Sequence, residues 1–462
     1  MSTSKATTNP LVVLFSILLL AGLLTYLVDS GSYQRDGKLV VPGSYSTIEK
    51  DRSVTNLWRV ESPVEGAAPV SLTELFLAIP EGLERGAGLI FMVLVIGGMF
   101  GILKQAGAVD AGLERLLSSV RGNVYVLVPS LMLVFAAGST FLGLASEYLL
   151  IIPLMVAMAE RLGLTKIIGL GIVTVAVKAG YLSSVTNPLP LTIAQPLVGV
   201  PIFSGAGLRF VFFLIFTIVG IGFMLWVIRR HAKLHGMHDH TTVSFESKRL
   251  SLRHTLMWLV LLSGIGFLVY ASNTWQWNKE QLTAFYLALS VVLAFMSGMG
   301  VSRAADAFVA GMKKILLASF LIGVAFAIAV TLEQGRILDT VIYGLTSLVG
   351  EGNAYVAAQA MLISQLGLDF LIPSTSGQAA VSMPILGPLG QLAGVGPQTT
   401  VLAFLFGNGI TNMITPTSGT LLAYLATAQV PWSQWAKFIL PLCLIFIALA
   451  MLMLSYAVML GA

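Results

Sequence analysis

Long apolar segments separated by short polar ones run from one end of the chain to the other. A helix needs about 20 predominantly apolar residues to cross the hydrocarbon core of a membrane. The pattern therefore predicts an all-α polytopic membrane protein with about nine transmembrane helices. The predicted crossings are 11–28, 88–103, 167–200, 208–228, 255–272, 283–298, 316–332, 399–428 and 436–460.

Two further apolar segments are interrupted near their centres by polar and helix-breaking residues. The stretch 138–147 divides the apolar segment 124–160, and the stretch 371–378 divides the segment 354–393. Non-helical backbone survives in hydrocarbon only where protein or a water-filled cavity satisfies its N–H and C=O groups. We therefore expect two re-entrant hairpins whose polar tips line a solute site.

Two of the predicted crossings contain proline-rich interruptions. Residues 186–190, Thr-Asn-Pro-Leu-Pro, interrupt the segment 167–200, and residues 415–419, Thr-Pro-Thr-Ser-Gly, interrupt the segment 399–428. Proline lacks a backbone N–H and disfavours helical geometry in the residue before it. Both crossings are therefore predicted to be broken helices.

The two halves of the chain place similar residues at one common spacing, which indicates an internal duplication. Three pairs lie 231 residues apart: Glu147 with Gln378, Pro153 with Pro384, and Gly163 with Gly394. Five predicted crossings separate the starts of the two copies, an odd number, so the repeats are predicted to have inverted topology. Inverted repeats with discontinuous helices are typical of secondary transporters. We expect a first repeat within 1–228, a linker at 229–254, and a second repeat within 255–462.

Composition and charge agree with a membrane protein. The 462 residues are 56% hydrophobic and 10% charged, whereas soluble domains contain roughly 25% charged residues. The net charge of +5 is concentrated in the linker and in segments at 105–121 and 303–314. Such basic loops face the cytoplasm, so the charge indicates an inner-membrane protein rather than a nucleic-acid partner.

The remaining connections carry a different charge balance. The segments 29–70 and 334–350 are predicted to lie outside, because acidic residues balance or outnumber basic ones there. The segment 71–86 is amphipathic and is predicted to be interfacial. This assignment makes the two hairpins enter the membrane from opposite faces.

The hairpin tips and helix breaks supply the candidate substrate-binding residues. Unwound carbonyls can hold a cation, while helix N-termini and hydroxyls can hold a carboxylate. The alternative is that these side chains only satisfy nearby backbone or join helices. The candidates are Ser139, Thr140, Ser146, Glu147, Asn187, Ser374, Thr375, Ser376, Gln378, Asn412, Thr415, Thr417 and Ser418.

Glu147 allows two interpretations. If Ser146 is the N-cap of the second hairpin arm, Glu147 complements the helix dipole. A carboxylate at membrane depth can instead pair with a cationic group of a solute or carry a proton.

Three residues are candidates for coupling. Lys178 lies about two turns before the first helix break, where a lysine is costly unless it faces protein or water. It can attract an anionic solute, neutralise Glu147, replace a coupling cation, or simply extend to the interface. Asp369 is either a pathway acid or a residue near the outer water, and Asn408 is the third candidate.

The sequence offers little support for other classes of protein. The histidine cluster at 235–240 can bind a transition metal, but a solvated linker is the expected role, and no metal site or cofactor is predicted. No histidine lies in the predicted membrane core, and no nucleophile-elbow or phosphate-loop motif is present, which disfavours an enzyme. Four convergent breaks fit a binding site better than the pore of a passive channel.

Four motifs are similar to those of a known family. They are Ser-Val-Thr-Asn-Pro at 184–188, Phe-Ser-Gly-Ala-Gly-Leu-Arg-Phe at 203–210, Ile-Pro-Ser-Thr-Ser-Gly-Gln-Ala-Ala at 372–380, and Thr-Asn-Met-Ile-Thr-Pro-Thr-Ser-Gly at 411–419. With them, the chain from about residue 88 onward resembles the YfcC-type branch of the anaerobic C4-dicarboxylate carrier family, within the ion transporter superfamily.

The resemblance implies an elevator-type homodimer in which hairpins and broken helices form the mobile domain. Members of this branch are labelled basic amino-acid or arginine/ornithine exchangers, and other relatives carry C4-dicarboxylates. Two positions depart from the family pattern: Asn408 stands where the resemblance implies an aspartate, and Lys178 lies in the pseudo-symmetric helix. The loss of an acid and the gain of an ammonium weaken the expectation of Na⁺ coupling and of a strongly cationic substrate.

The sequence thus predicts a secondary active transporter or exchanger of a small charged metabolite. The substrate is either an amino acid, with a basic one among the options, or a carboxylate, and a C4-dicarboxylate or other organic-anion carrier is the alternative. The coupling ion, Na⁺ or H⁺, stays open. The expected partners are this solute, the lipid bilayer and a second copy of the chain.

Overall fold

The computed structural model describes residues 10–36, 39–60, 66–119, 123–234, 251–275, 277, 279–349 and 353–462. These residues are overwhelmingly helical, and eight of their helices are long and apolar enough to cross a membrane. The prediction of an all-α polytopic membrane protein is confirmed. The histidine cluster at 235–240 lies outside the described residues.

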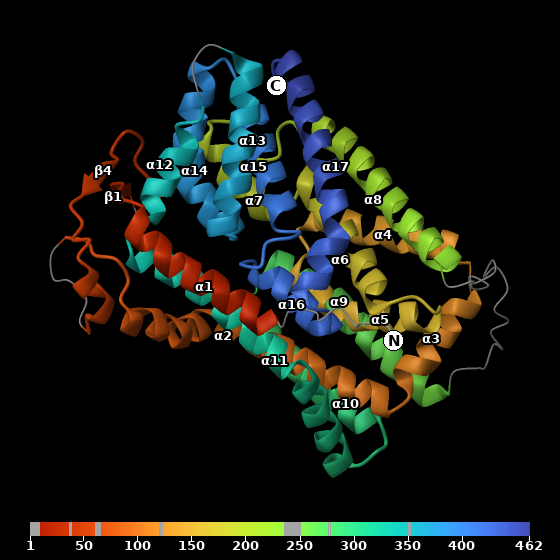
Figure 1. Ribbon diagram of the computed structural model, residues 1–462. Coiled ribbons are helices and arrows are strands. Elements are labelled where there is room, and N and C mark those ends of the chain that lie inside the picture. Colours follow the sequence, from red (N-terminus) through yellow and green to blue (C-terminus); the bar gives the residue numbers. More distant parts are fainter. Residues whose placement is uncertain are drawn as a thin grey trace.

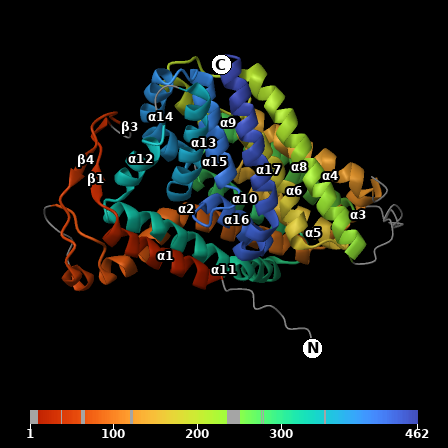
Figure 2. The same ribbon diagram turned by 45° about the horizontal axis from the view of Figure 1, so that its top comes forward.

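One group of helices is built around two long ones that lie side by side (Figures 1 and 2). These are α2 (Leu72–Gln105) and α11 (Val301–Gln334), each 34 residues long. Three further helices pack against them or against one another. They are α1 (Pro10–Leu27), α9 (Leu252–Thr274) and α10 (Lys279–Met296).

The sequence prediction divided each of the two long helices in two, and this division is wrong. The segments 71–86 and 88–103 form one helix, which begins with a capping box between Ser71 and Glu74 and tolerates Pro80 in its interior. The inner segment 303–314 likewise continues into the crossing 316–332 without a break.

Glycines explain how closely the two long helices approach. A Cβ atom added at Gly311 would lie 2.2 Å from the carbonyl oxygen of Gly97, and one added at Gly101 would lie 2.2 Å from that of Ala307. Small residues of this kind allow membrane helices to pack backbone against backbone.

A second group of helices contains the hairpins and the broken helices. Its first half comprises α4 (Val124–Leu142), a 3-10 turn η2 (Ser146–Leu150), α5 (Ile152–Arg161), α6 (Lys166–Ser183), α7 (Pro188–Leu197) and α8 (Ala206–Leu234). Its second half comprises α13 (Ala354–Leu371), α14 (Thr375–Leu392), α15 (Pro397–Thr411), α16 (Gly419–Ala428) and α17 (Trp432–Met459).

The two halves follow the same order of elements. Each has a 34-residue helix, a short helix, a hairpin, a broken helix with a 10-residue second part, and a long closing helix. The short helices are α3 (Ala108–Ser119) and α12 (Leu338–Thr346). This order agrees with a duplication, while the opposite membrane orientation of the copies stays a prediction.

The tips and the first break are shorter than predicted, and the second break is longer and begins earlier. Residues 138–142, assigned to the first tip, are still helical in α4, which ends where Gly143 adopts a left-handed φ of 74°. Thr375 already begins α14, with Ser374 as its N-cap. Pro188 begins α7 directly after the N-cap Asn187, because proline fits the first position of a helix. The first break therefore comprises residues 184–187. The second break comprises residues 412–418. Of the predicted linker, 229–234 belongs to α8.

The predicted outer loop contains short strands that the sequence analysis did not anticipate. Strand β1 (Ser30–Ser32) pairs antiparallel with β4 (Ser46–Ile48), and β2 (Arg35–Asp36) pairs antiparallel with β3 (Leu39–Val40). A 3-10 turn, η1 (Val54–Trp58), follows.

This outer loop packs onto the second hairpin and the helix before it. Buried Tyr33 and Val40 of the loop form a small core with Ile342, Leu368 and Ile385, from α12, α13 and α14. Hydrogen bonds strengthen the contact, because Asp339 of α12 accepts from the Tyr33 backbone N–H at 3.0 Å and from Arg35 at 2.5 Å. The loop therefore connects the first helix group to the second hairpin.

Candidate functional site

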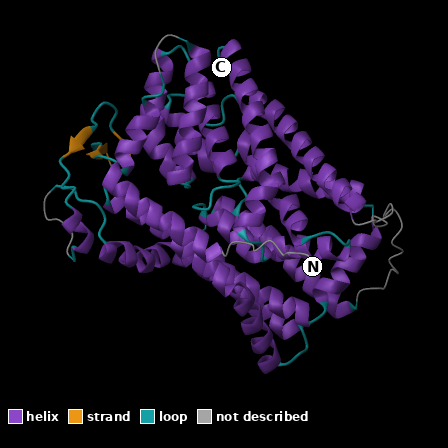
Figure 3. Cartoon of the chain, viewed as in Figure 1, coloured by secondary structure: helices purple, strands orange, loops and turns teal. Residues whose placement is uncertain are grey.

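A cavity of about 480 Å³ lies where the two helix groups meet. Its walls come from both hairpin tips, α6, the second break and the long helices α2 and α11. Figure 3 shows loop segments in the middle of the helical body, not only at its edges. Half of the sixteen predicted site residues line this cavity. They are Ser139, Ser146, Lys178, Ser374, Thr375, Ser376, Asn412 and Thr417.

The cavity presents several groups that favour an anion. Lys178 of α6 reaches it, and the first residues of α14 and α16, at 375–376 and 419–420, contribute to its wall. The N-terminus of a helix carries unpaired N–H groups and a partial positive charge. Three of the four charged residues along the cavity wall are basic. This arrangement suits a carboxylate.

Charged residues of the first helix group lie at one side of the cavity. Arg85 of α2 forms ion pairs with Glu81 at 2.7 Å and with Glu333 of α11 at 2.7 Å, and Lys279 of α10 lies nearby on the same wall. All four side chains are substantially exposed. We therefore expect these charges to steer a solute more than to hold it.

A buried polar network lies behind the cavity and contains the other two predicted coupling residues. Asp369 of α13 is fully buried, and its Oδ1 accepts hydrogen bonds from the amides of Asn408 at 2.6 Å and Asn412 at 2.7 Å. Its Oδ2 has no hydrogen-bond partner among the described residues. The charges of Asp369 and Lys178 interact electrostatically. Asp369 is therefore buried in protein, and the choice between a pathway acid and a residue near the outer water stays a prediction.

Asn408 connects this network to the cavity wall. Its amide also donates to Gln378 at 2.7 Å, and its carbonyl oxygen accepts from the hydroxyl of Tyr181. Tyr181 in turn lies 3.0 Å, hydroxyl to hydroxyl, from Thr375 at the start of α14. Tyr181 thus joins the second hairpin tip to the buried network.

The first hairpin tip is bound to the first helix break. Thr140 Oγ1 accepts the backbone N–H of Val185 at 3.0 Å, and the Thr140 carbonyl accepts that of Thr186 at 3.1 Å. Asn187 accepts from the N–H of Leu189 at 3.0 Å as the N-cap of α7. Thr140 and Asn187 therefore fix the backbone of this region, and neither lines the cavity.

Glu147 makes a local contact. Its Oε2 accepts the backbone N–H of Ala145 at 2.9 Å, and its side chain is not part of the cavity wall. The interpretation of Ser146 as an N-cap is wrong, because Ala145 occupies the cap position without a side-chain hydrogen bond. Glu147 thus satisfies the backbone of the tip, and a direct role toward solute stays a prediction.

The second break is held against the second hairpin. Thr417 Oγ1 donates to the Phe370 carbonyl at 2.7 Å and lies 2.7 Å from Thr415 Oγ1. Ser418 donates to Asn412 at 2.6 Å and caps α16. Of this set only Asn412 and Thr417 reach the cavity. The predicted site residues therefore divide into a lining set and a supporting set.

Two residues of the cavity wall and the buried network escaped the sequence analysis. Tyr181 lies three positions after Lys178 on one helix face, and that spacing was a usable signal. Gln365 of α13 receives the Gln378 amide at 2.6 Å and donates to Ser382 at 3.0 Å, which no local pattern indicates. In the described ranges, no group of three histidine, cysteine or acidic residues is placed to bind a metal ion.

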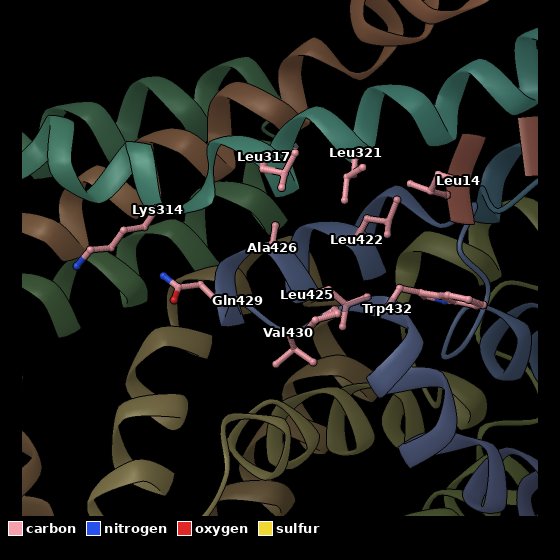
Figure 4. A pocket seen from close by; sticks show the side chains of 11 residues that line it. Leu14, Lys314, Leu317, Leu321, Leu422, Leu425, Ala426, Gln429, Val430 and Trp432 are labelled. Carbon is pink, nitrogen blue, oxygen red and sulfur yellow. The ribbon is translucent and has the colours of Figure 1, made fainter. Parts of the chain in front are cut away.

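A second cavity, of about 190 Å³, lies between the helix groups and differs in character. Figure 4 shows leucine side chains gathered around it, with Lys314 and Gln429 on one side. Trp432 closes it, and its indole N–H donates to the Ile414 carbonyl at 2.7 Å. Because most of its lining is apolar, it is a poor site for a charged metabolite.

A multi-pass helical protein with hairpins, broken helices and a polar central cavity has the features of a secondary transporter. The chain matches the family described as the C4-dicarboxylate anaerobic carrier, DcuC, over residues 9–459, and it belongs to that family. This membership defines it as a carrier and a multi-pass membrane protein, not an enzyme.

Comparison with individual proteins gives the same class. The chain is 30% identical to the "Putative basic amino acid antiporter YfcC" of Escherichia coli (strain K12), across 93% of this chain and 92% of that protein. It is 25% identical to an uncharacterized protein of Haemophilus influenzae, with 96% of each covered. These relatives are bacterial, in agreement with an inner-membrane location.

Two solved structures are more distantly similar. The YdaH transporter of Alcanivorax borkumensis is 16% identical with a TM-score of 0.43, covering 98% of both chains. MtrF of Neisseria gonorrhoeae, from a class of antimetabolite efflux pumps, is 15% identical with a TM-score of 0.40, covering 97% of this chain and 95% of that one. These scores are too low to support conclusions about mechanism.

Proposed function

We propose that this secondary transporter exchanges small metabolites that carry a carboxylate, either an amino acid or a dicarboxylate. The observation that carries the proposal is the wall of the 480 Å³ cavity, where Lys178 lies with the N-terminal residues of α14 and α16. A carboxylate is also the group shared by the two substrate classes named for the family and for the Escherichia coli relative.

In this proposal the lining set holds the solute and the supporting set keeps the backbone of the tips in place. Ser374, Thr375 and Ser376 offer hydroxyl and backbone donors at the start of α14. Lys178 supplies the fixed charge, and Asp369 keeps that lysine protonated or receives its proton. Transport is therefore largely independent of Na⁺, with H⁺ or counter-substrate as the coupling species.

The second helix group moves as an elevator against the first one, and two copies of the chain pair through the first group. The family resemblance supports this picture, as does the division of the helices into two groups that meet at the cavity.

Counterflow in proteoliposomes tests the function. Vesicles loaded with unlabelled amino acids or di- and tricarboxylates are diluted into a trace of labelled solute, and a loaded partner should accelerate uptake. A passive channel would show no such trans-stimulation, and an enzyme would release a changed product. A thermal-shift screen of the same compounds should identify the solute, because a ligand at 100 times its Kd adds about 2.7 kcal/mol of stability.

A further inference from the structure

Arg209 is a buried charge that lies outside the cavity described above. It belongs to the first turn of α8, and 1% of its surface is exposed. A buried guanidinium is costly unless it is paired or fully hydrogen-bonded. The hydrogen bonds described for Arg209 all go to uncharged oxygen atoms, so its positive charge is not cancelled by a carboxylate hydrogen-bonded to it.

The guanidinium is directed at the first helix break. Its Nε donates to the carbonyl of Ser184 at 3.2 Å, and Nη2 donates to that of Val185 at 3.2 Å. These two carbonyls follow the end of α6, where a helix carries partial negative charge. In broken-helix transporters, such unwound carbonyls are the groups that coordinate a coupling cation.

The other side of Arg209 is held in a prepared position. Nη1 donates to the Ser204 carbonyl at 2.7 Å and to Gln398 Oε1 at 3.2 Å. Gly205 has a left-handed φ of 74°, and a Cβ atom there would lie 2.7 Å from Gln398 Oε1. Only glycine leaves room for this arrangement, so the guanidinium position is built into the loop before α8.

Carbonyls of the second break are satisfied by donors of the closing helix as well, but these donors carry no charge. Two of these carbonyls belong to Met413 and Ile414. They accept hydrogen bonds from the indole N–H groups of Trp435 at 2.8 Å and Trp432 at 2.7 Å. Both tryptophans lie in α17, the counterpart of α8. Carbonyls of the first break are thus satisfied by a cation, and carbonyls of the second break by neutral donors.

Building on the proposed transport function, we propose that Arg209 is the fixed cation of the first break. Its guanidinium takes the place at the Ser184 and Val185 carbonyls that a dissolved alkali cation would need. The first break therefore requires no bound ion, and any coupling ion acts on the side of Asp369. Arg209 is a positioning residue, because it acts through the break and not on the solute.

The test uses the purified full-length chain and measures thermal unfolding in detergent, a readout that does not require transport. Guanidinium chloride or NaCl is added in millimolar steps to Arg209→Ala, Arg209→Lys and the wild type. Choline chloride replaces the added salt in the reference samples, so that the ionic strength stays constant. Trp435→Phe is the matched control, since it removes one donor from the second break without removing a charge. Arg209→Gln replaces the alanine variant if the latter does not fold.

We expect guanidinium or Na⁺ to raise the unfolding temperature of Arg209→Ala in a saturable way, by roughly 1 °C for each fivefold increase in the equilibrium constant for folding that the bound cation produces. The wild type, Arg209→Lys and Trp435→Phe should show no saturable rise. The absence of a rise in both neutral variants of Arg209, or an equal rise in the wild type, would overturn the proposal. Counterflow by the wild type is measured in a separate experiment. Its absence would refute the proposed transport function and would leave the role proposed for Arg209 unaffected.

Discussion

Replacing Lys178 by methionine should remove the main attraction of the cavity for a carboxylate. The side chain reaches the cavity from α6 and is partly shielded from water, so methionine preserves its length and apolar stem while it removes the ammonium. A hydrogen bond to a charged group contributes about 1.5–3 kcal/mol. The Kd for a carboxylate substrate should therefore rise roughly 10- to 150-fold.

The same substitution also leaves the buried Asp369 without its electrostatic partner. Removal of one member of a fully buried, directly paired set of charges costs about 3–5 kcal/mol. Because Lys178 lies at the cavity wall and is only partly buried, the cost here should be smaller. The single variant should therefore be less stable than the wild type, and adding Asp369→Asn should restore much of the stability. Affinity should not return in the double variant, because the ammonium is still missing.

The assay is titration of the purified protein with the solute identified by counterflow, together with thermal unfolding of each variant. Lys279→Met serves as control, since Lys279 lies on the same cavity wall but is exposed, and it should change Kd by no more than about fivefold. If the stable double variant binds the solute as tightly as the wild type, Lys178 is not a substrate ligand. A steep rise of wild-type uptake with Na⁺ at fixed pH would refute the proposed coupling.

Three further predictions concern packing, topology and pH. Gly311→Ala should destabilise the protein by about 1–3 kcal/mol in thermal unfolding, because the new Cβ would lie 2.2 Å from a backbone oxygen, whereas Gly222→Ala, with nothing within 4 Å, should be neutral. In a chain without its native cysteine, Thr165→Cys should react with an impermeant maleimide from the cytoplasm and Gln391→Cys from outside; labelling of both from one side would exclude inverted repeats. Burial in the outer loop lowers the pKa of Lys50 to about 8 from 10.5, so the unfolded chain holds this proton longer and stability should rise between pH 8 and 10.5. Lys50→Met should abolish that rise.

The sequence located the polar interruptions well because their cause is local. Prolines and runs of serine and threonine disrupt an apolar helix wherever they occur, so the region of each tip and break could be recognised without knowledge of packing. The order of helices followed from the same reasoning.

What the sequence did not reveal depends on contacts between distant segments. Gln365 lies in an ordinary apolar helix, and only the packing of α13 against α14 and α15 shows that it supports Gln378. Arg209 was visible within a motif, yet its role depends on carbonyls 24 and 25 residues away in the chain. Helix α2 was divided because its first half is amphipathic, although the contact with α11 keeps it continuous.

The outer loop has a mechanical consequence. It begins and ends in helices of the first group, α1 and α2, but its residues Tyr33 and Val40 are buried against the second hairpin, and Arg35 reaches across to Asp339. If the second hairpin travels relative to α2, this contact has to detach or stretch in every cycle. A binder that holds this contact in place would then arrest the carrier without competing for its substrate.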